Sequence, residues 1–302
     1  MSPTSDASLL GIDWGTSNRR AWWLSATGGV LAEWSDDQGL LAVQGRRYAE
    51  SLQSLLGHGP ALAAQAPVVM SGMVGSASGW LEVPYLDAVV PLLQIVHNLA
   101  PVSAAGARCF IVPGMCLATP DGSVDVMRGE ETQLLGALAL DNGDGWYVLP
   151  GTHSKWVRVH EGRVADLATY MTGELFALLT RHGTLSSVTR DGNDDATAFA
   201  RGVAAAGRSA LSNALFGCRA QVVSGRLPGT QAREYLSGLL IGAEWHDVQR
   251  RAGRAPRRVT LIGSAQLEQR YTRVAAMFSC KITALDAREV QLAALRAMQK
   301  TL

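Results

Sequence analysis

The sequence contains one short pattern twice, and this repeat constrains the fold more than any other feature. In residues 9–30 an apolar strand runs into Gly15-Thr16, followed by basic residues and an aromatic-rich strand that ends at a glycine turn. Residues 146–164 repeat this order, with Gly151-Thr152 at the corresponding bend. Because internal similarity marks a structural unit used more than once, we predict two similar domains. The alternative is that any two β-hairpins look alike.

Strands alternate with helices after each of these openings, which is the pattern of an α/β fold. Thr172 is a candidate N-cap for a helix over 172–182, because a threonine hydroxyl can accept from the first free amides. Gly136 and Ala293-Ala294 are candidates for the point at which two helices cross in an interdomain hinge. The remaining predicted strands are 67–71, 108–112, 257–262 and 280–285, and the remaining helices are 45–57, 130–140, 231–252, 266–278 and 288–300. Residues 193–217 are predicted to form two short helices.

Composition excludes several classes of protein. The 302 residues carry 27 Lys and Arg against 26 Asp and Glu, so no basic excess is present for nucleic-acid binding. With 47% hydrophobic and 18% charged residues, the chain is not of the disordered class. No apolar run is long enough for a membrane span. Four scattered cysteines without a CxxC pair and a start without a signal peptide predict a cytoplasmic protein with reduced thiols.

The Gly-Thr bend has a chemical consequence. A strand that ends at Gly-Thr turns its backbone N–H groups outward, and glycine lets an anion approach without meeting a Cβ. Two such bends that face one cleft would hold a polyphosphate. Asp13 precedes the first bend and supplies a carboxylate that suits Mg²⁺, through water. A P-loop sequence is absent, and GSASG has Ala77 where a nucleophile elbow needs serine, which disfavours an α/β-hydrolase.

Several segments together resemble the actin-like sugar-kinase superfamily, and within it most closely the 2-dehydro-3-deoxygalactonokinases. These segments are IDWGTSNRRAW, VVMSGMVGSASGW, VMRGEETQLLGA, PGTHSKWV, YMTGEL and SGLLIGAE, and they span Ile12 to Glu244. The resemblance implies two RNase H-like (actin/hexokinase-type) α/β domains around a cleft, each with a mixed five-stranded sheet. The N-terminal substrate and phosphate domain would comprise 1–127 plus a C-terminal helix at about 286–302, and the nucleotide domain 128–285.

The resemblance also implies an activity. The chain would be an ATP-dependent kinase that phosphorylates the 6-hydroxyl of 2-dehydro-3-deoxy-D-galactonate to the 6-phosphate, in galactonate catabolism. Its partners would be the sugar acid and ATP with Mg²⁺, with no nucleic acid or membrane, and a homodimer is possible. The alternatives are another carbohydrate kinase of the superfamily, or a sugar- or nucleotide-sensing regulator without catalysis. Retention of Asp13 and Glu130 favours chemistry over sensing.

For catalysis the resemblance implies Glu130 as the base that accepts the hydroxyl proton and Asp13 as the metal ligand. Related kinases have aspartate after this glycine; glutamate is one methylene longer, so Glu131 is not excluded. The alternative is that both acids only complement a helix N-terminus. The nucleotide and its phosphates would meet the two Gly-Thr bends and a small-residue loop after the strand 257–262, namely Gly15, Thr16, Ser17, Gly151, Thr152, Gly263 and Ser264.

For substrate binding the resemblance points to the glycine-rich loop after the strand 67–71. Small residues there would let backbone amides reach a polyol or a carboxylate, or the loop is an ordinary surface loop. Arg20 faces either the phosphates and acid substrate or only solvent, and Arg128 is a candidate partner of the substrate carboxylate, with Trp80 and Tyr85 nearby in the pocket. The implied substrate-binding residues are Arg20, Ser71, Gly72, Met73, Gly75 and Arg128.

Overall fold

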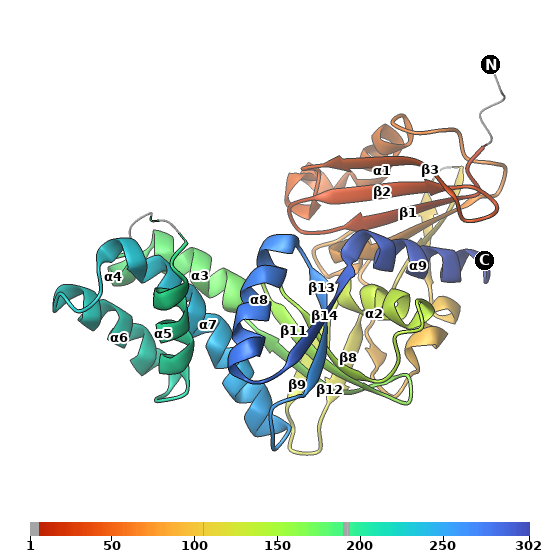
Figure 1. Ribbon diagram of the computed structural model, residues 1–302. Coiled ribbons are helices and arrows are strands. Elements are labelled where there is room, and N and C mark those ends of the chain that lie inside the picture. The colour runs from red at the N-terminus through yellow and green to blue at the C-terminus, as the bar shows by residue number, and fades with distance from the viewer. Residues whose placement is uncertain (1–5, 105, 190–191, 193) are drawn as a thin grey trace. The chain divides into compact units, whose positions relative to one another are not determined.

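The computed structural model describes residues 6–104, 106–189, 192 and 194–302. The chain forms two compact units, and the elements of both are labelled in Figure 1. Unit 1 comprises Met1–Asp144, Arg158–Leu167 and Asp286–Leu302, and unit 2 comprises Gly145–Val157 and Ala168–Leu285. The functional division at residues 127 and 128 inferred from the sequence stays a prediction.

Unit 1 is built on a six-stranded sheet of order β3-β2-β1-β4-β7-β6. Its strands are β1 (Leu9–Trp14), β2 (Arg19–Leu24), β3 (Val30–Asp36), β4 (Pro67–Gly72), β6 (Ala100–Ala104) and β7 (Ala107–Ile111). The central strand β1 pairs antiparallel with β2 and parallel with β4, which places Asp13 beside both Arg20 and Ser71. Every residue of β4 is buried, as expected for the interior of a sheet covered on both faces.

Alternate residues of β1 point to opposite faces of this sheet, and both faces are covered by helices. Ile12 belongs to the core cluster that includes Leu52 of α1 (Tyr48–Leu56). On the other face, a Cβ at Gly11 would overlap Leu295 of α9 (Ala287–Gln299) at 2.2 Å. Figure 1 shows α1 and α9 on opposite sides of the strands β1 to β3.

Unit 2 contains most of a five-stranded sheet of order β12-β11-β10-β13-β14. The strands are β10 (Gly145–Leu149), β11 (Ser154–His160), β12 (Arg163–Tyr170), β13 (Arg258–Gly263) and β14 (Lys281–Asp286). This order repeats that of the first five strands of the other sheet, and both hairpins turn at a left-handed glycine, Gly28 with φ 79° and Gly162 with φ 66°. The predicted duplication is therefore confirmed.

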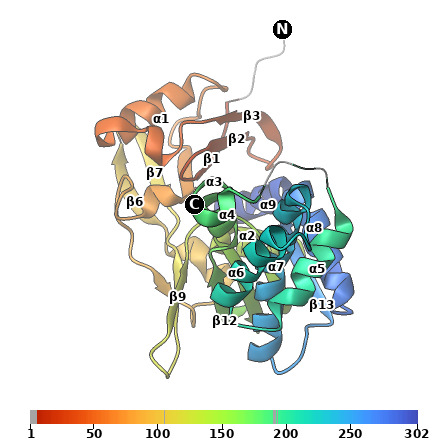
Figure 2. The same ribbon diagram turned by 90° about the vertical axis from the view of Figure 1, so that its left-hand side faces the viewer.

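The helices of unit 2 pack closely through glycines. They are α3 (Thr172–Arg181), α4 (Gly183–Ser186), α5 (Ala196–Ala206), α6 (Leu211–Val223), α7 (Gly229–Arg251) and α8 (Ala265–Met277). A Cβ at Gly202 of α5 would lie 2.0 Å from the carbonyl oxygen of Tyr235 on α7, so only glycine permits this approach. Figure 2 shows α5, α6 and α7 beside one another. Ile241 and Trp245 of α7 reach the sheet core with Tyr271 of α8.

The helix crossing predicted for an interdomain hinge lies between α2 (Glu130–Ala139) and α9, at Gly136 as expected, but both helices belong to unit 1. A Cβ at Gly136 would lie 1.9 Å from the carbonyl oxygen of Val290. The residue of α9 closest to Gly136 is therefore Val290, about one turn before the predicted position at Ala293-Ala294.

Three expectations were wrong or incomplete. The first sheet has a sixth strand, β6, and unit 1 carries a further sheet of order β5-β8-β9, formed by β5 (Leu86–Asp87), β8 (Met115–Ala118) and β9 (Val124–Met127). The N-cap of α3 is Met171, and no side chain caps it; the Thr172 hydroxyl donates to Glu244 instead. Short 3₁₀ turns, which the sequence did not predict, occupy Leu40–Ala42, Gln44–Arg46, Met73–Gly75 and Leu92–His97.

All four cysteines are free thiols, and three are buried, as the sequence predicts for small apolar residues; Cys116 is half-buried. Across the part of the chain that the structure describes, every helix is too short or too polar to traverse a lipid bilayer.

Candidate active site

The first Gly-Thr bend has a fixed backbone. The Gly15 N–H donates to the carbonyl oxygen of Asn18 at 3.0 Å and closes the turn. The carbonyl oxygens of Gly15 and Thr16 accept from Leu40 and Leu41 at 2.9 and 3.1 Å. The side chain of Thr16 is exposed. The bend therefore presents a hydroxyl to solvent on a backbone that is held from behind.

Asp13 forms an ion pair with Arg20 at the end of β1. The Arg20 Nη2 lies 2.7 Å from the Asp13 Oδ2, and the two side chains are 49% and 20% exposed. The sequence left open whether Arg20 faces a ligand or only solvent. In the structure it faces Asp13, because the two residues are directly opposite in the antiparallel register of β1 and β2. That register, which the hairpin turn sets, is the sequence signal that could have predicted the pair.

Two left-handed glycines bring the start of α2 against the end of β1. Gly72 has φ 89°, and a Cβ there would lie 2.8 Å from the Trp14 carbonyl oxygen and 3.4 Å from the Asp13 Oδ1. Gly129 has φ 109°, and a Cβ there would lie 3.4 Å from the Gly72 Cα. Asp13, Gly72 and Gly129 are thus neighbours, and Glu130 follows Gly129 directly. The two acids singled out in the sequence therefore belong to one region of unit 1.

Glu130 and Glu131 have different surroundings. Glu130 is half-buried, and its Oε2 accepts from the Arg128 backbone N–H at 3.1 Å. Glu131 is fully buried and accepts from the Gly129 N–H at 2.6 Å and from the Thr132 hydroxyl at 3.0 Å. Burial, with the neighbouring charge of Glu130, raises the pKa of Glu131 to about 8. Glu131 thus bonds to the start of its own helix and is closed to solvent, whereas Glu130 is half-buried.

Arg128 has unsatisfied hydrogen-bond donors. Its Nη2 donates to the Val83 carbonyl oxygen at 2.6 Å, and its guanidinium lies 4.3 Å from the ring centre of Tyr85. Its Nε and Nη1 are buried without a hydrogen-bond partner among the described residues, as is the hydroxyl of Ser76. The glycine-rich loop approaches this guanidinium, because a Cβ at Gly75 would lie 2.8 Å from Nη1. Buried donors without acceptors are rare and costly, which makes this group a candidate binding element.

The other residues of that loop differ in accessibility. The Ser71 hydroxyl is buried and bonds within the protein, donating to the Ile12 carbonyl oxygen at 3.3 Å and lying 3.3 Å from the Gln291 amide. Met73 is half-buried, and Gly75 is buried. Ser71 therefore supports the end of the sheet in this structure.

The second Gly-Thr bend lies against the start of α3. The Glu174 N–H donates to the Thr152 carbonyl oxygen at 3.0 Å, and a Cβ at Gly173 would overlap the Gly151 carbonyl oxygen at 2.4 Å. Thr152 is exposed, and nothing described lies within 4 Å of the position that a Cβ of Gly151 would take. His153 pairs with Glu174 at 2.5 Å, which is a structural role.

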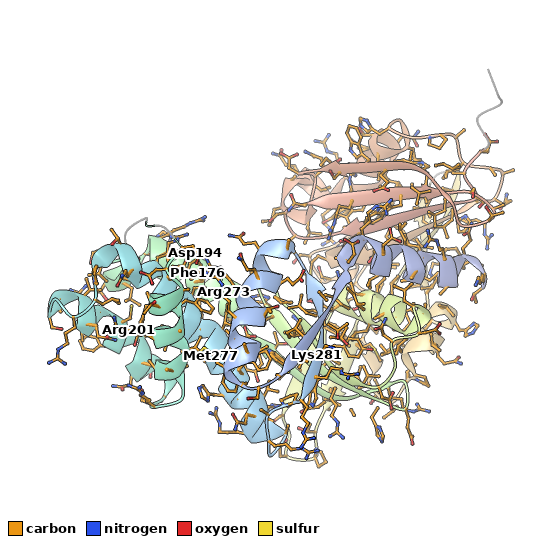
Figure 3. All side chains as sticks on the ribbon, viewed as in Figure 1. Phe176, Asp194, Arg201, Arg273, Met277 and Lys281 are labelled. Carbon is orange, nitrogen blue, oxygen red and sulfur yellow. The ribbon has the colours of Figure 1, made fainter. Side chains whose placement is uncertain are left out.

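A pocket of about 220 Å³ opens beside this second bend. Gly151 and Ser154 line it from the sheet side, and Phe176 of α3, labelled in Figure 3, lines it from the helical side. Gln266 and Leu267 line it from the first turn of α8, directly after Gly263 and Ser264. Gly263 and Ser264 are not among the lining residues. They immediately precede α8, whose first turn lines the pocket. The further lining residues are Thr172, Gly173, Arg233, Ser237, Leu240, Ile241, Arg270 and Tyr271.

Two acids near this pocket were not assigned a role from the sequence. Glu234 forms a bidentate ion pair with Arg270 of the pocket wall, at 2.8 Å for both bonds. Glu244 is fully buried and accepts from Trp156, Thr172 and Tyr271. Burial raises the pKa of Glu244 to about 7. On α8, three residues after Arg270, the Arg273 guanidinium pairs with Asp194 at 2.6 Å (Figure 3).

Comparison with known proteins identifies the family of this chain. The model of the 2-keto-3-deoxy-galactonokinase family matches residues 13–298. The chain belongs to this family. Members of this family are kinases, so the chain is an ATP-dependent phosphotransferase, and its fold is of the actin-like sugar-kinase class that the sequence predicted.

Individual relatives agree with the family assignment. The chain is 36% identical over 280 residues to the 2-dehydro-3-deoxygalactonokinase of Escherichia coli (strain K12), covering 92% of this chain and 93% of that protein. It is 35% identical over 300 residues to a Rhizobium meliloti (strain 1021) protein assigned the same activity, covering 96% of both. A crystal structure of a Sinorhizobium meliloti protein assigned as such a kinase matches this kinase with a TM-score of 0.86 and 32% identity, over 97% and 96% of the two chains.

Proposed function

We propose that this kinase transfers the terminal phosphoryl group of ATP to the 6-hydroxyl of 2-dehydro-3-deoxy-D-galactonate and yields the 6-phosphate, a step of galactonate catabolism. The observation that carries the proposal is the contact of Gly72 with both Asp13 and Gly129, which gathers a metal-binding carboxylate and the acid Glu130 in one region. Phosphoryl transfer to an alcohol needs such a pair, one group for the phosphates and one for the hydroxyl proton.

Glu130 is the proposed general base. Its carboxylate is half-buried at the first turn of α2, where the helix dipole stabilises negative charge. It would orient the 6-hydroxyl and accept its proton as the bond to phosphorus forms, while ADP leaves with the electrons of the broken bond. The bond from the Arg128 N–H to the Glu130 Oε2 fixes the orientation of this carboxylate.

Asp13 is the proposed Mg²⁺-binding residue. A magnesium ion bound with nucleotide needs only one or two protein carboxylates, because phosphate and water oxygens fill the other positions. Asp13 fits this requirement, since its carboxylate is part-exposed and already has a cationic partner in Arg20. When bound, Mg²⁺ would neutralise charge on the phosphates. Arg20 would then be free to contact the phosphates or the acid substrate.

The proposed phosphate-binding residues are Gly15, Thr16 and Ser17 of the first bend and Gly151 and Thr152 of the second. The proposed residues for the nucleotide base are Gly263 and Ser264. Support comes from the open space over Gly151 and from the pocket beside it, whose wall continues into α8 after Ser264. A glycine without neighbours at its Cβ position is the environment that lets a phosphate approach the backbone.

Arg128 is the proposed partner of the substrate carboxylate. Its Nε and Nη1 are buried without a partner among the described residues, and either N–H could donate a charge-assisted bond to a carboxylate oxygen. The loop residues Gly72, Met73 and Gly75 would contact the rest of the sugar acid beside it. Ser71 would act through the sheet end that it supports, because its hydroxyl already has internal partners.

The experiment is a coupled ATP-turnover assay with 2-dehydro-3-deoxy-D-galactonate, its C4 epimer and neutral hexoses, with the phosphorylated carbon located by NMR. We expect turnover with the keto-deoxy acids and a product phosphorylated at C6. Turnover with a neutral hexose and none with the acids would refute the proposal in favour of another carbohydrate kinase. ATP binding without turnover of any sugar would refute it in favour of a sensing protein.

A matched pair of variants tests the acid specificity. Arg128→Met should raise the KM for the sugar acid by about 10- to 100-fold, because a charged hydrogen-bonding partner is lost. The KM for ATP should change little. Arg108→Met is the control, since Arg108 also lies over an aromatic ring, that of Phe110 at 5.7 Å, but is away from the loop. Equal KM values in both variants would remove Arg128 from carboxylate binding.

A further inference from the structure

One buried carboxylate joins the four elements that surround the unit 2 pocket. Glu244, on α7, is 1% exposed. It accepts from the indole N–H of Trp156 on β11 and from the Tyr271 hydroxyl on α8, both at 2.8 Å, and from the Thr172 hydroxyl on α3.

The hydroxyls in this network belong to the pocket wall. Thr172, Tyr271 and Ser154 all line the pocket, and the Ser154 hydroxyl lies 3.0 Å from that of Tyr271. Ser154 follows the second Gly-Thr bend by two residues, and Thr172 precedes Gly173, which packs on the Gly151 carbonyl oxygen. The network therefore fixes both ends of the contact that holds this bend against α3.

Stability alone does not account for an acid at this position. A buried carboxylate loses its hydration, and apolar side chains of similar size are often equally or more stabilising there. The neighbours of Glu244 on α7, Ile241 and Trp245, are buried apolar residues of the sheet core. An acid among them gains only its side-chain donors, and those of Thr172 and Tyr271 belong to residues that line the pocket.

We infer that Glu244 is a positioning residue of the nucleotide side: it holds Thr172, Tyr271 and, through Tyr271, Ser154 in the arrangement that keeps the bend Gly151–Thr152 open to phosphate. The inference rests on the proposed function of that bend. Glu244 does not itself meet the ligand, because its carboxylate is covered by the residues that it orients.

The test uses near-isosteric substitutions that each remove one hydroxyl of the network. Thr172→Val and Tyr271→Phe each delete one donor, and each should raise the KM for ATP and the Kd of a non-hydrolysable ATP analogue about tenfold, the scale of one charge-assisted bond. The KM for the sugar acid should stay within about twofold of wild type. Tyr170→Phe is the matched control, because the Tyr170 hydroxyl donates to Asp247 on the same helix at 2.7 Å and does not line the pocket.

Two substitutions of Glu244 itself form the second part of the test. Glu244→Gln can still accept from Trp156 through its amide oxygen and donate to the Thr172 hydroxyl, so ATP affinity should stay within about threefold of wild type. Glu244→Leu, which fills the space without an acceptor, should weaken ATP binding at least tenfold.

Two results would overturn the inference. Thr172→Val and Tyr271→Phe variants that lose thermal stability but keep the wild-type ATP affinity would show a purely structural network. A Glu244→Gln variant as impaired as Glu244→Leu would show that charge, not positioning, matters. Failure of the proposed function is distinguishable, because wild-type protein would then not bind the ATP analogue.

Discussion

Replacement of Glu131 by glutamine should change how the stability of unit 1 depends on pH. The Glu131 carboxyl is fully buried at the start of α2, and its pKa rises from an ordinary value of 4.5 to about 8. At a pH between these two pKa values, the Glu131 carboxyl is protonated in the folded protein and ionised in the unfolded chain. The free energy of unfolding must therefore fall as pH rises through this range.

The magnitude follows from the size of the shift. One proton difference changes the free energy of unfolding by about 1.4 kcal/mol per pH unit. Because this slope is smaller close to each pKa, Glu131 accounts for a loss of about 3.5 kcal/mol between pH 5 and pH 8. Glutamine does not ionise, and its amide oxygen still accepts from the Gly129 N–H. The advantage of Glu131→Gln over wild type should therefore grow with pH by about 1.4 kcal/mol per unit up to pH 8 and level off above it.

Equilibrium urea unfolding at half-unit intervals from pH 5 to pH 9 measures this difference directly. Glu50→Gln is the control, because Glu50 also lies in the first turn of a helix but is 70% exposed in its side chain. Unfolding free energies of wild type and Glu131→Gln that run parallel across the whole range would refute the argument. Such a result would mean that the Glu131 carboxylate is ionised in the folded protein.

Three further outcomes are expected. Glu130→Gln should lower kcat by about 100-fold or more with ATP binding intact, and near-normal turnover would exclude Glu130 as the base. Asp13→Asn should raise the Mg²⁺ concentration for half-maximal activity at least about tenfold, and an unchanged metal dependence would contradict its role. Gly136→Ala should lower the free energy of unfolding by about 1–3 kcal/mol in a thermal-unfolding measurement, because the added Cβ meets the Val290 carbonyl oxygen. Gly143→Ala is the control, because nothing described lies within 4 Å of the position of its Cβ.

The parts of the fold that the sequence predicted well are those with strong local signals. The two hairpins carry apolar strands and glycine turns, so their repeat and the resulting strand order were predictable. The strands β8 and β9 were missed because they are short, and Val124–Met127 contains an aspartate between its apolar residues. The strand β6 was missed because Ala100–Ala104 has small and polar residues without clear alternation.

The candidate site divides in the same way. Glu130 and the Gly-Thr bends are local motifs, and the resemblance to sugar kinases found them. Glu244 had no such signal, because its significance depends on Trp156, Thr172 and Tyr271, which are distant in sequence. Thr172 was misassigned for the same reason: a helix start suggests a cap, and only the packing of α7 offers its hydroxyl a stronger acceptor.

The position of α9 has a consequence for biosynthesis. The last helix contributes Leu295 to the face of β1 at Gly11, and its Arg296 and Gln299 donate to the carbonyl oxygens of Gly28 and Ser25. Because α9 follows unit 2 in the chain, the opening hairpin gains this partner only after unit 2 has been translated. During that interval the face of β1 that α9 covers is exposed to other nascent chains, and unit 2, which needs no later segment, can complete its own core first.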